Sequence, residues 1–175
     1  LNAGLVEKAP ILDNVIYYDG TVATDPDNEK FLHNEVGVNW GTEKVGVRVS
    51  AYDTDWKDRN LTKSVQTGQG SSGDTDIIFL TGVNQKHQGL ELETKVKPTD
   101  KIELDFIASY GNWKFDGDAD GTYQEQEYND NNQVIGVTTT EYSYALDGLY
   151  VGDMPQTSYI LGLTYKPIKG LRLQA

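Results

Sequence analysis

The chain has 175 residues, of which 37% are hydrophobic, and this share is too small for a membrane protein built from helices. No run of 18 or more apolar residues occurs, which excludes a transmembrane helix but not a β-barrel, whose strands present apolar side chains at every second residue. The net charge of −12 disfavours nucleic acid as a partner, and the lack of cysteine excludes disulfides and thiolate metal sites.

Five segments alternate apolar and polar residues with a period of two, which predicts antiparallel strands of an all-β protein. In chain order these segments cover residues 30–40, 44–56, 90–97, 101–115 and 158–165. Residues 1–6 resemble the tail of one further strand, and residues 171–175 resemble the start of another. We therefore expect about seven strands, and we expect residues 1–175 to be one part of a longer barrel domain.

The alternation gives each predicted strand an apolar face and a polar face. The second strand, for example, sets Val45, Val47 and Val49 against Arg48 and Ser50, whereas Ile160 breaks the pattern in the last strand. Charges at this density cannot line a dry core without a large desolvation cost, so they predict a wet or plugged lumen or a solvent face. The charged positions of the polar face are Glu35, Arg48, Glu91, Glu93, Lys95, Glu103 and Asp105.

The connections between strands alternate between very short and very long. Tight turns are predicted at residues 41–44, 97–100 and 166–170, and long polar stretches at residues 10–29, 57–81 and 116–156. This asymmetry is typical of a transmembrane β-barrel with short periplasmic turns and long extracellular loops. The eight steps from residue 102 to residue 110 span about 26 Å, or about 20 Å of membrane height at a tilt of about 40°.

Aromatic residues also favour a barrel, although they leave an alternative open. Trp40 and Tyr165 adjoin short turns while Tyr110 and Tyr159 lie nearer the long stretches, as expected for two interfacial girdles. The alternative is a soluble extracellular β-sandwich that binds carbohydrate with Ca²⁺ support. Such a sandwich would bury one apolar face, including Val47, Leu104 and Leu161.

Residues 116–127 satisfy the pattern of an EF-hand loop, which binds Ca²⁺ through hard oxygen ligands. Gly121 would make the sharp turn, but the flanking residues do not look helical, and an acidic loop can match the pattern by chance. The predicted Ca²⁺ ligands are Asp116, Asp118, Asp120, Thr122 and Glu127. If Ca²⁺ binds, we expect it to order an external loop.

Several loop aromatics are candidates for stacking on a ligand, although they could equally pack the loops: Tyr17, Tyr18, Trp56, Tyr142 and Tyr144. His33 and His87 lie far apart in sequence with no nucleophile suggested nearby, so a catalytic or zinc site is not predicted. No catalytic constellation is present, and the chain is not expected to be an enzyme.

Short motifs spread over nearly the whole chain resemble the barrel of TonB-dependent outer-membrane receptors, especially those of the Bacteroidetes type. They include residues 7–10, 56–59, 81–84, 87–92, 111–114, 151–157 and 165–171. The resemblance implies a 22-stranded barrel with an N-terminal plug, inserted among outer-membrane lipid and energised by TonB. It also implies import of a scarce solute such as an iron chelate, cobalamin, a glycan or a peptide, with a surface lipoprotein as a further partner.

Overall fold

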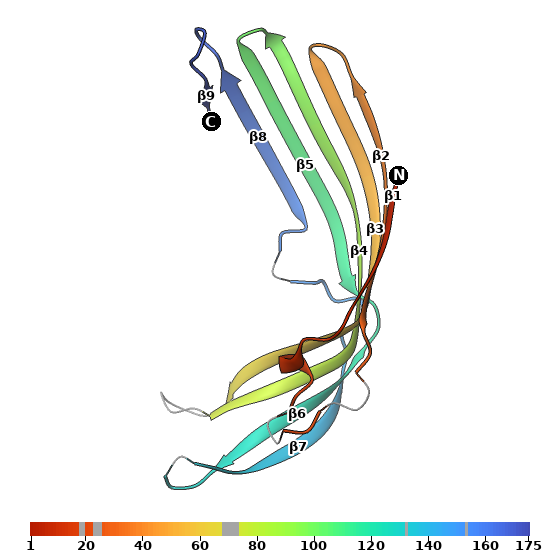
Figure 1. Cartoon of the computed structure of the whole chain (residues 1–175), viewed down its shortest axis with the longest axis vertical. Helices are drawn as coiled ribbons and strands as arrows, with labels where there is room; N and C mark the ends of the chain where they lie inside the picture. The colour runs from red at the N-terminus through yellow and green to blue at the C-terminus, as the bar shows by residue number, and fades with distance from the viewer. Residues whose placement is uncertain (18–19, 23–25, 68–73, 132, 153) are drawn as a thin grey trace.

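In the computed structural model, one antiparallel sheet dominates the chain (Figure 1). The structure describes residues 1–17, 20–22, 26–67, 74–131, 133–152 and 154–175. Within these residues the sheet has nine strands, and the only helix is one short 3-10 turn, η1 (Leu12–Asn14). None of the described helices is long and apolar enough to cross a membrane.

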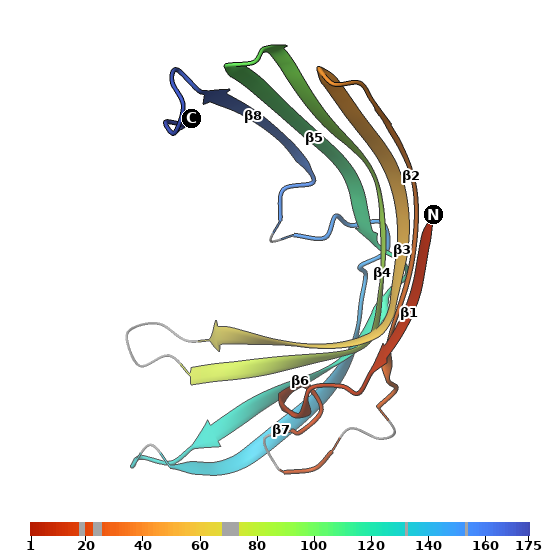
Figure 2. The ribbon, with the colours of Figure 1, turned by 45° about the horizontal axis from the view of Figure 1, so that its top comes forward.

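Seven of the strands form a continuous wall in the order β1-β2-β3-β4-β5-β8-β9, and every pair in it is antiparallel. This number matches the seven strands that the sequence predicts. Figure 2 shows that the wall is curved and open. In the strand order, β1 and β9 are its two edge strands. The wall strands are β1 (Asn2–Lys8), β2 (Glu29–Gly41), β3 (Val45–Thr67), β4 (Asp74–Thr99), β5 (Ile102–Phe115), β8 (Thr157–Tyr165) and β9 (Leu173–Gln174).

The three predicted tight turns join β2 to β3, β4 to β5 and β8 to β9, and all lie at the same end of the sheet (Figure 1). In the first turn the Thr42 hydroxyl accepts hydrogen bonds from the backbone N–H groups of Lys44 (3.3 Å) and Val45 (3.1 Å). A Thr side chain in this role stabilises a turn without a longer loop. The prediction of three tight turns is therefore confirmed.

Strand register aligns the apolar positions across the wall. Val38 lies opposite Val49, Val49 opposite Leu92, and Phe106 opposite Leu161. These side chains are exposed, with 76% of Leu161 and 67% of Val38 accessible. Trp40, Tyr110, Tyr159 and Tyr165, the four predicted girdle residues, are also exposed on this apolar face.

The polar face of the same wall carries ion pairs. Arg48 contacts Glu35 (3.2 Å), and Lys95 contacts Glu103 (3.0 Å) and Asp105 (3.3 Å). Ile160, the exception to the sequence pattern, pairs directly with Ile107, so the two form an apolar pair on the polar face. A soluble sandwich is not favoured, because in the described residues no second sheet covers the apolar face, and Leu104 and Leu161 are exposed.

Two of the three long connections are not the loops that the sequence predicts. β3 continues to Thr67 and β4 starts at Asp74, so most of residues 57–81 is a long hairpin. Residues 116–156 contain a second hairpin of β6 (Ala119–Tyr128) and β7 (Val134–Tyr144). The prediction of long loops is wrong here because both faces of these strands are polar or mixed, which removes the period-two signal.

The β6–β7 hairpin extends the sheet beyond the wall. β3 occupies one edge of β4, while the other edge pairs with β5 through residues 85–99 and then with β6 through residues 77–81, so β6 follows β5 in line. Asp58 in β3 and Gly82 in β4 both have positive φ, at 57° and 65°, and the β3–β4 register shifts between Trp56 and Leu61. Such irregularities bend strands, and here they mark where the wall gives way to an outer sheet of β3, β4, β6 and β7.

The buried apolar side chains of the described residues lie in this outer sheet and in the segment around η1. They are Val15, Phe79, Val83 and Ala119, each at most 4% exposed. The Tyr17 ring meets Phe79 edge-on at a centroid distance of 4.9 Å. The outer sheet thus has a small core of its own, whereas the wall has an exposed apolar face.

Candidate functional site

Aromatic side chains gather on the polar face where the wall meets the outer sheet. Phe31 meets Trp56 edge-on at 5.7 Å, and His87 stacks on Trp113 at 5.3 Å. The indole Nε1 of Trp113 donates a hydrogen bond to the hydroxyl of Tyr52 (2.9 Å). These residues occupy facing positions on β2, β3, β4 and β5, and we name them the polar-face aromatic cluster: Phe31, His33, Tyr52, Trp56, His87 and Trp113.

Glycines let the rings of this cluster lie flat against the sheet. A Cβ atom at Gly89 would lie 2.3 Å from the Tyr52 hydroxyl oxygen, and one at Gly111 would lie 2.7 Å from Nε1 of Trp113. Both glycines pair with each other across β4 and β5. Only glycine therefore leaves room for the Tyr52 and Trp113 rings in these positions.

Arg59 adds a positive charge to the cluster. Its guanidinium lies 3.7 Å from the centroid of the Trp56 ring and donates to Oε1 of Gln85 (2.7 Å). Burial lowers the pKa of Arg59, and the Glu29 carboxylate opposes this shift. The Glu29 carboxylate in turn accepts a hydrogen bond from Nε1 of Trp56 (3.3 Å). Charged groups, the Gln85 amide and aromatic rings therefore lie next to one another.

Burial also lowers the pKa of His87, and the charge of Arg59 lowers it further. The imidazole is therefore neutral at neutral pH, and its Nε2 lies 3.2 Å from Oε1 of Gln85. Aromatic stacking needs no charge on either ring. The neutral His87 ring and the Trp113 indole therefore suit contact with a flat ligand. The cluster offers π faces beside hydrogen-bonding groups, an arrangement that can hold a ring-shaped solute.

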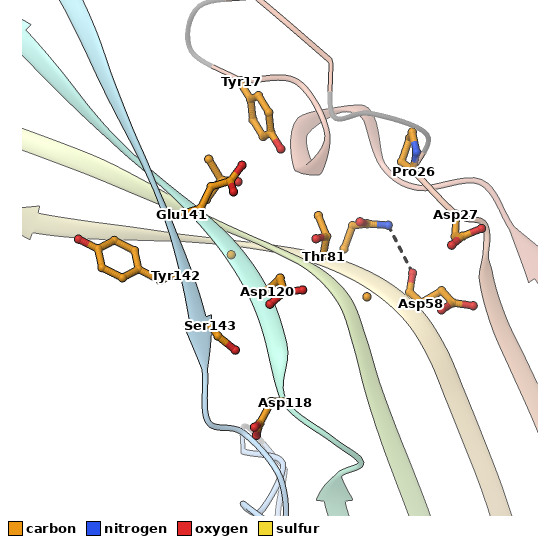
Figure 3. A pocket seen from close by; sticks show the side chains of 14 residues that line it. Tyr17, Pro26, Asp27, Asp58, Thr81, Asp118, Asp120, Glu141, Tyr142 and Ser143 are labelled. Atoms are coloured by element: carbon orange, nitrogen blue, oxygen red, sulfur yellow. Dashed lines mark hydrogen bonds between the residues drawn. The ribbon is translucent and has the colours of Figure 1, made fainter.

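A second site is a cavity of about 680 Å³ in the outer sheet. Figure 3 shows that side chains from the segment before β2, from β3 and from the β6–β7 hairpin surround it. Its carboxylates are Asp27, Asp58, Asp118, Asp120 and Glu141. The cavity is of a size that holds small ligands, and its charge suits cationic groups.

Few of the cavity's carboxylates are neutralised by the protein. Asp58 pairs with Lys30 (3.3 Å), and Oδ1 of Asp118 accepts from the backbone N–H groups of Leu146 and Asp147. Within the described part of the chain, neither Asp120 nor Glu141 has a lysine or arginine at ion-pair distance. Negative charge is therefore left available to a ligand or partner.

The segment between β1 and β2 forms one side of this cavity. The amide of Asn14 donates to the backbone carbonyl of Asn60 (2.6 Å), and the Thr62 hydroxyl donates to Oδ1 of Asn14 (3.0 Å). With the Tyr17–Phe79 contact, these bonds fasten η1 onto β3 and β4. Tyr17 thereby reaches the rim of the cavity, as Figure 3 shows.

The predicted ligand-stacking aromatics do not form one group. Trp56 belongs to the polar-face aromatic cluster and Tyr17 to the cavity rim, whereas Tyr18 lies outside the described residues. Tyr142 lines the cavity and also meets Tyr123 and Tyr144 edge-on. Sequence reasoning missed Tyr52 and Trp113 as cluster members, although Gly89 and Gly111, which leave room for their rings, were a usable signal.

The predicted Ca²⁺ ligands do not converge. β6 begins at Ala119, so the eight steps from there to Glu127 extend for about 26 Å instead of wrapping around a centre. Glu127 accepts from the Thr138 hydroxyl (2.8 Å), and among the described residues no three His, Asp or Glu side chains are grouped to hold a metal. The five residues Asp116, Asp118, Asp120, Thr122 and Glu127 thus lie in or just before an extended strand and not around one centre, and their binding of Ca²⁺ stays a prediction.

The two histidines occupy strand positions near the outer sheet. His33 contacts the Thr54 hydroxyl through Nδ1 (2.7 Å), and His87 contacts Gln85. Each ring is held by a side-chain hydrogen bond and by aromatic neighbours. Their places agree with the prediction that they are ordinary strand residues of the polar face.

Comparison with known proteins gives one match. The family described as "TonB dependent receptor-like, beta-barrel" matches residues 2–174, which is nearly the whole chain. Neither the curated proteins nor the solved structures give a match. The family match does not distinguish the Bacteroidetes type, which stays a prediction.

Proposed function

The chain belongs to the TonB-dependent receptor β-barrel family of the bacterial outer membrane, and from this we propose that its sheet is one part of a closed barrel that captures and imports a scarce solute. Family membership makes the protein part of an outer-membrane receptor and transporter. The closing strands, the plug and the contact with TonB belong to the proposal. Iron chelates, cobalamin, glycans and peptides are the candidate solutes.

The observation that carries the proposal is the opposite character of the two faces of one sheet. Apolar side chains in register across β2, β3, β4, β5 and β8 are exposed on one face, while ion pairs such as Arg48–Glu35 lie on the other. An exposed apolar band suits lipid, and a charged face suits a lumen filled with water or a plug. This arrangement supports the proposal that a polar solute is imported past the charged face.

We propose further that the solute contacts the polar-face aromatic cluster on its way to the lumen. Tyr52, Trp56 and Trp113 present ring faces beside Arg59 and Gln85. Ring faces adjoining hydrogen-bonding groups favour a solute with a ring of its own, such as a sugar or a cyclic chelate. The proposed role is binding and import without a catalysed reaction. Ca²⁺, if it binds, orders the outer segments.

Gel mobility and cysteine labelling test the barrel. The full-length receptor, taken from an outer-membrane fraction, is expected to run faster on SDS gels without boiling than after boiling. Because this chain has no cysteine, Leu161→Cys and Ser109→Cys give a matched pair on the two faces. We expect a lipid-soluble fluorescence quencher to reach a probe on position 161 and not one on position 109, and the reverse result would contradict the assignment.

Intrinsic fluorescence tests the ligand contact. One ferric hydroxamate chelate, cobalamin, a maltodextrin and a casein hydrolysate would be titrated against the purified receptor. We expect Trp113→Ala to weaken the response to whichever solute binds, and Trp40→Ala, which removes an exposed indole from the apolar face, to leave its affinity unchanged. Equal affinity in both variants would remove the cluster from the binding site without affecting the barrel assignment.

A further inference from the structure

The segment between β7 and β8 supplies hydrogen-bond partners to the outer end of β5. β8 itself pairs with β5 only as far as Tyr110. Further out, the backbone N–H of Gly111 donates to the carbonyl of Gln156. The backbone N–H of Phe115 donates to the carbonyl of Leu149 (2.9 Å). On this side, the outer end of β5 is therefore held by the segment that precedes β8.

Trp113 lies between these two positions, and its backbone N–H pairs with a side chain. It donates to Oε1 of Gln156 (2.9 Å), while Nε2 of Gln156 donates to the carbonyls of Trp113 (3.1 Å) and Val151 (3.2 Å). The Trp113 carbonyl also accepts from the backbone N–H of Val151 (3.0 Å). The oxygen and both N–H groups of the Gln156 amide are thus in use. This amide pairs with Trp113 as a peptide group of a neighbouring strand would.

The spacing of the residues explains why a side chain is needed here. Val151 and Gln156 are five positions apart, whereas their partners on β5, Trp113 and Gly111, are two positions apart. The two chains cannot stay in step over this stretch, as at a β-bulge. A backbone N–H group requires a partner, and the Gln156 side chain supplies it to Trp113.

The backbone of Trp113 determines where its indole lies. The indole Nε1 donates to the Tyr52 hydroxyl (2.9 Å), and the ring stacks on His87 at 5.3 Å. A Cβ atom at Gly111 would lie 2.9 Å from Cε2 of the indole and 3.1 Å from the carbonyl oxygen of Gln156. The ring and the Gln156 backbone therefore pack against the same glycine. A shift of this strand end would move the indole away from both ring partners, because hydrogen bonds weaken steeply with misalignment.

We propose that Gln156 is a positioning residue for the solute site, a role that rests on the solute contact proposed for the polar-face aromatic cluster. Its amide fixes the backbone of Trp113, so the indole is already oriented when the solute arrives. Such preorganisation raises affinity because less ordering is left to occur on binding. Gln156 acts through Trp113 and lies outside the cluster, on the segment that returns from the β6–β7 hairpin to the wall (Figure 1).

The first test locates the Trp113 ring without any solute. The full-length receptor in detergent would carry 5-fluorotryptophan, and the fluorine resonance of Trp113 would be assigned by its loss in Trp113→Phe. We expect Gln156→Met, which keeps the length of the side chain but none of its three amide hydrogen bonds, to shift or broaden this resonance. An unchanged resonance would overturn the proposal.

Gln88→Met is the matched control for this variant. Gln88 is exposed on β4, on the opposite face from its neighbour His87. The same replacement there is expected to leave the Trp113 resonance in place, and an equal shift in both variants would overturn the proposal. An unchanged heat shift on gels would show that each variant is folded. If Gln156→Met did not fold, Gln156→Glu, which keeps the acceptor and loses two donors, would be measured in its place under the same criteria.

A double-mutant cycle tests the effect on affinity. The four solutes named above would be titrated by calorimetry into the wild type, Gln156→Met, Trp113→Ala and the double variant. We expect Gln156→Met to weaken the solute that binds about fivefold, the factor to which one net hydrogen bond of about 1 kcal/mol corresponds. Because Gln156 acts through the indole, the double variant should bind no more weakly than Trp113→Ala alone. Additive losses would overturn the proposal.

The same titrations separate this role from the proposed function. If Trp113→Ala weakened binding and Gln156→Met did not, the solute contact would stand and the positioning role alone would fail. If Trp113→Ala bound as tightly as the wild type, the solute contact of the cluster would fail, and the role of Gln156 in binding would fail with it. If none of the four solutes bound the wild type, the fluorine resonance would still decide whether Gln156 positions the ring.

Discussion

The wall and the outer sheet share strands β3 and β4 but bury opposite kinds of side chain. In the wall the apolar residues are exposed, as Leu161 and Val38 are, and charges such as Arg48 and Glu35 pair on the other face. In the outer sheet, Phe79 is 2% exposed and is covered by the segment around η1. Along β4, apolar side chains are therefore exposed in the wall and buried in the outer sheet.

This change in burial coincides with the change from lipid to water around the sheet. Beyond Leu90, the face that is apolar in the wall carries Lys86, whose amine lies 3.5 Å from Asp55 and 3.7 Å from Asp53. These two carboxylates raise the pKa of Lys86, Asp55 having the larger effect. Such a charge group belongs in water, so it marks the outer limit of the lipid-facing band.

Phe79→Ala has the largest expected effect, and it should be confined to the outer sheet. Replacing a buried phenylalanine by alanine costs about 3–5 kcal/mol, and here the cost falls on the contact that holds Tyr17 and η1 in place. We expect faster proteolysis and faster amide exchange in residues 60–67, 74–81, 119–131 and 133–144, with the heat shift of the barrel unchanged. Leu12→Ala, an exposed residue of η1, is the control and should change neither.

The opposite outcome would break the comparison. If Phe79→Ala abolished the heat shift as well as speeding proteolysis of the outer sheet, the two regions would be one cooperative unit. The small core around Phe79 would then support the wall itself.

Phe106→Arg and Ile107→Arg test the wall with two neighbouring apolar residues of nearly equal exposure, 37% and 38%. Phe106 faces Leu161 on the apolar face, where an arginine near the bilayer midplane costs about 2–4 kcal/mol. Ile107 lies opposite Glu93 on the polar face, where an arginine gains a carboxylate neighbour. We expect urea unfolding in lipid vesicles to show a large loss for the first variant and little for the second, and equal losses would contradict the assignment of faces.

Much of this wall could be predicted from sequence because lipid and lumen impose a strict alternation. Val45, Val47 and Val49 against Arg48 and Ser50 fixed the strand and its faces without any tertiary information. The β6–β7 hairpin could not be predicted in the same way. Gln124 is 1% exposed there, so polarity no longer reports burial.

The candidate sites were less predictable than the strands, for the same reason. Trp56 and Trp113 are 57 positions apart, and only the register through β3, β4 and β5 brings them to one cluster. The twelve residues from Asp116 to Glu127 match a loop motif, yet pairing with β4 and β7 makes most of them a strand. Long-range pairing, which a local motif does not contain, decided both outcomes.

Gly89→Ala tests the junction between the two regions and has a smaller expected effect. The added methyl group would meet the Tyr52 ring, so Tyr52 must turn away and lose its hydrogen bond from Trp113. Overpacking of this kind costs about 1–3 kcal/mol. We expect a lower urea midpoint and a changed Trp113 fluorescence, and Tyr52→Ala in the same chain should recover part of the loss.

Gly46→Ala is the matched control for this variant, because nothing lies within 4 Å of a Cβ atom there. Its midpoint should stay close to that of the wild type. If both glycine variants lost the same stability, backbone entropy would explain the effect, and the packing of the Tyr52 ring against Gly89 would not.

His87 gives the smallest expected effect, a pH dependence at the same junction. Burial and then Arg59 lower the pKa of His87, so the unfolded chain binds a proton more readily than the folded one. Stability is therefore complete above the ordinary histidine pKa of about 6.5 and falls as the pH drops below it. We expect the urea midpoint of the wild type to decline between about pH 6.5 and pH 5 more steeply than that of His87→Gln, which cannot be protonated. All other titratable groups are the same in both proteins. The difference between the two slopes of urea midpoint against pH therefore isolates the His87 ring. Parallel slopes would mean that water reaches His87 freely, and the polar-face aromatic cluster would then belong to the solvated outer region and not to the buried junction.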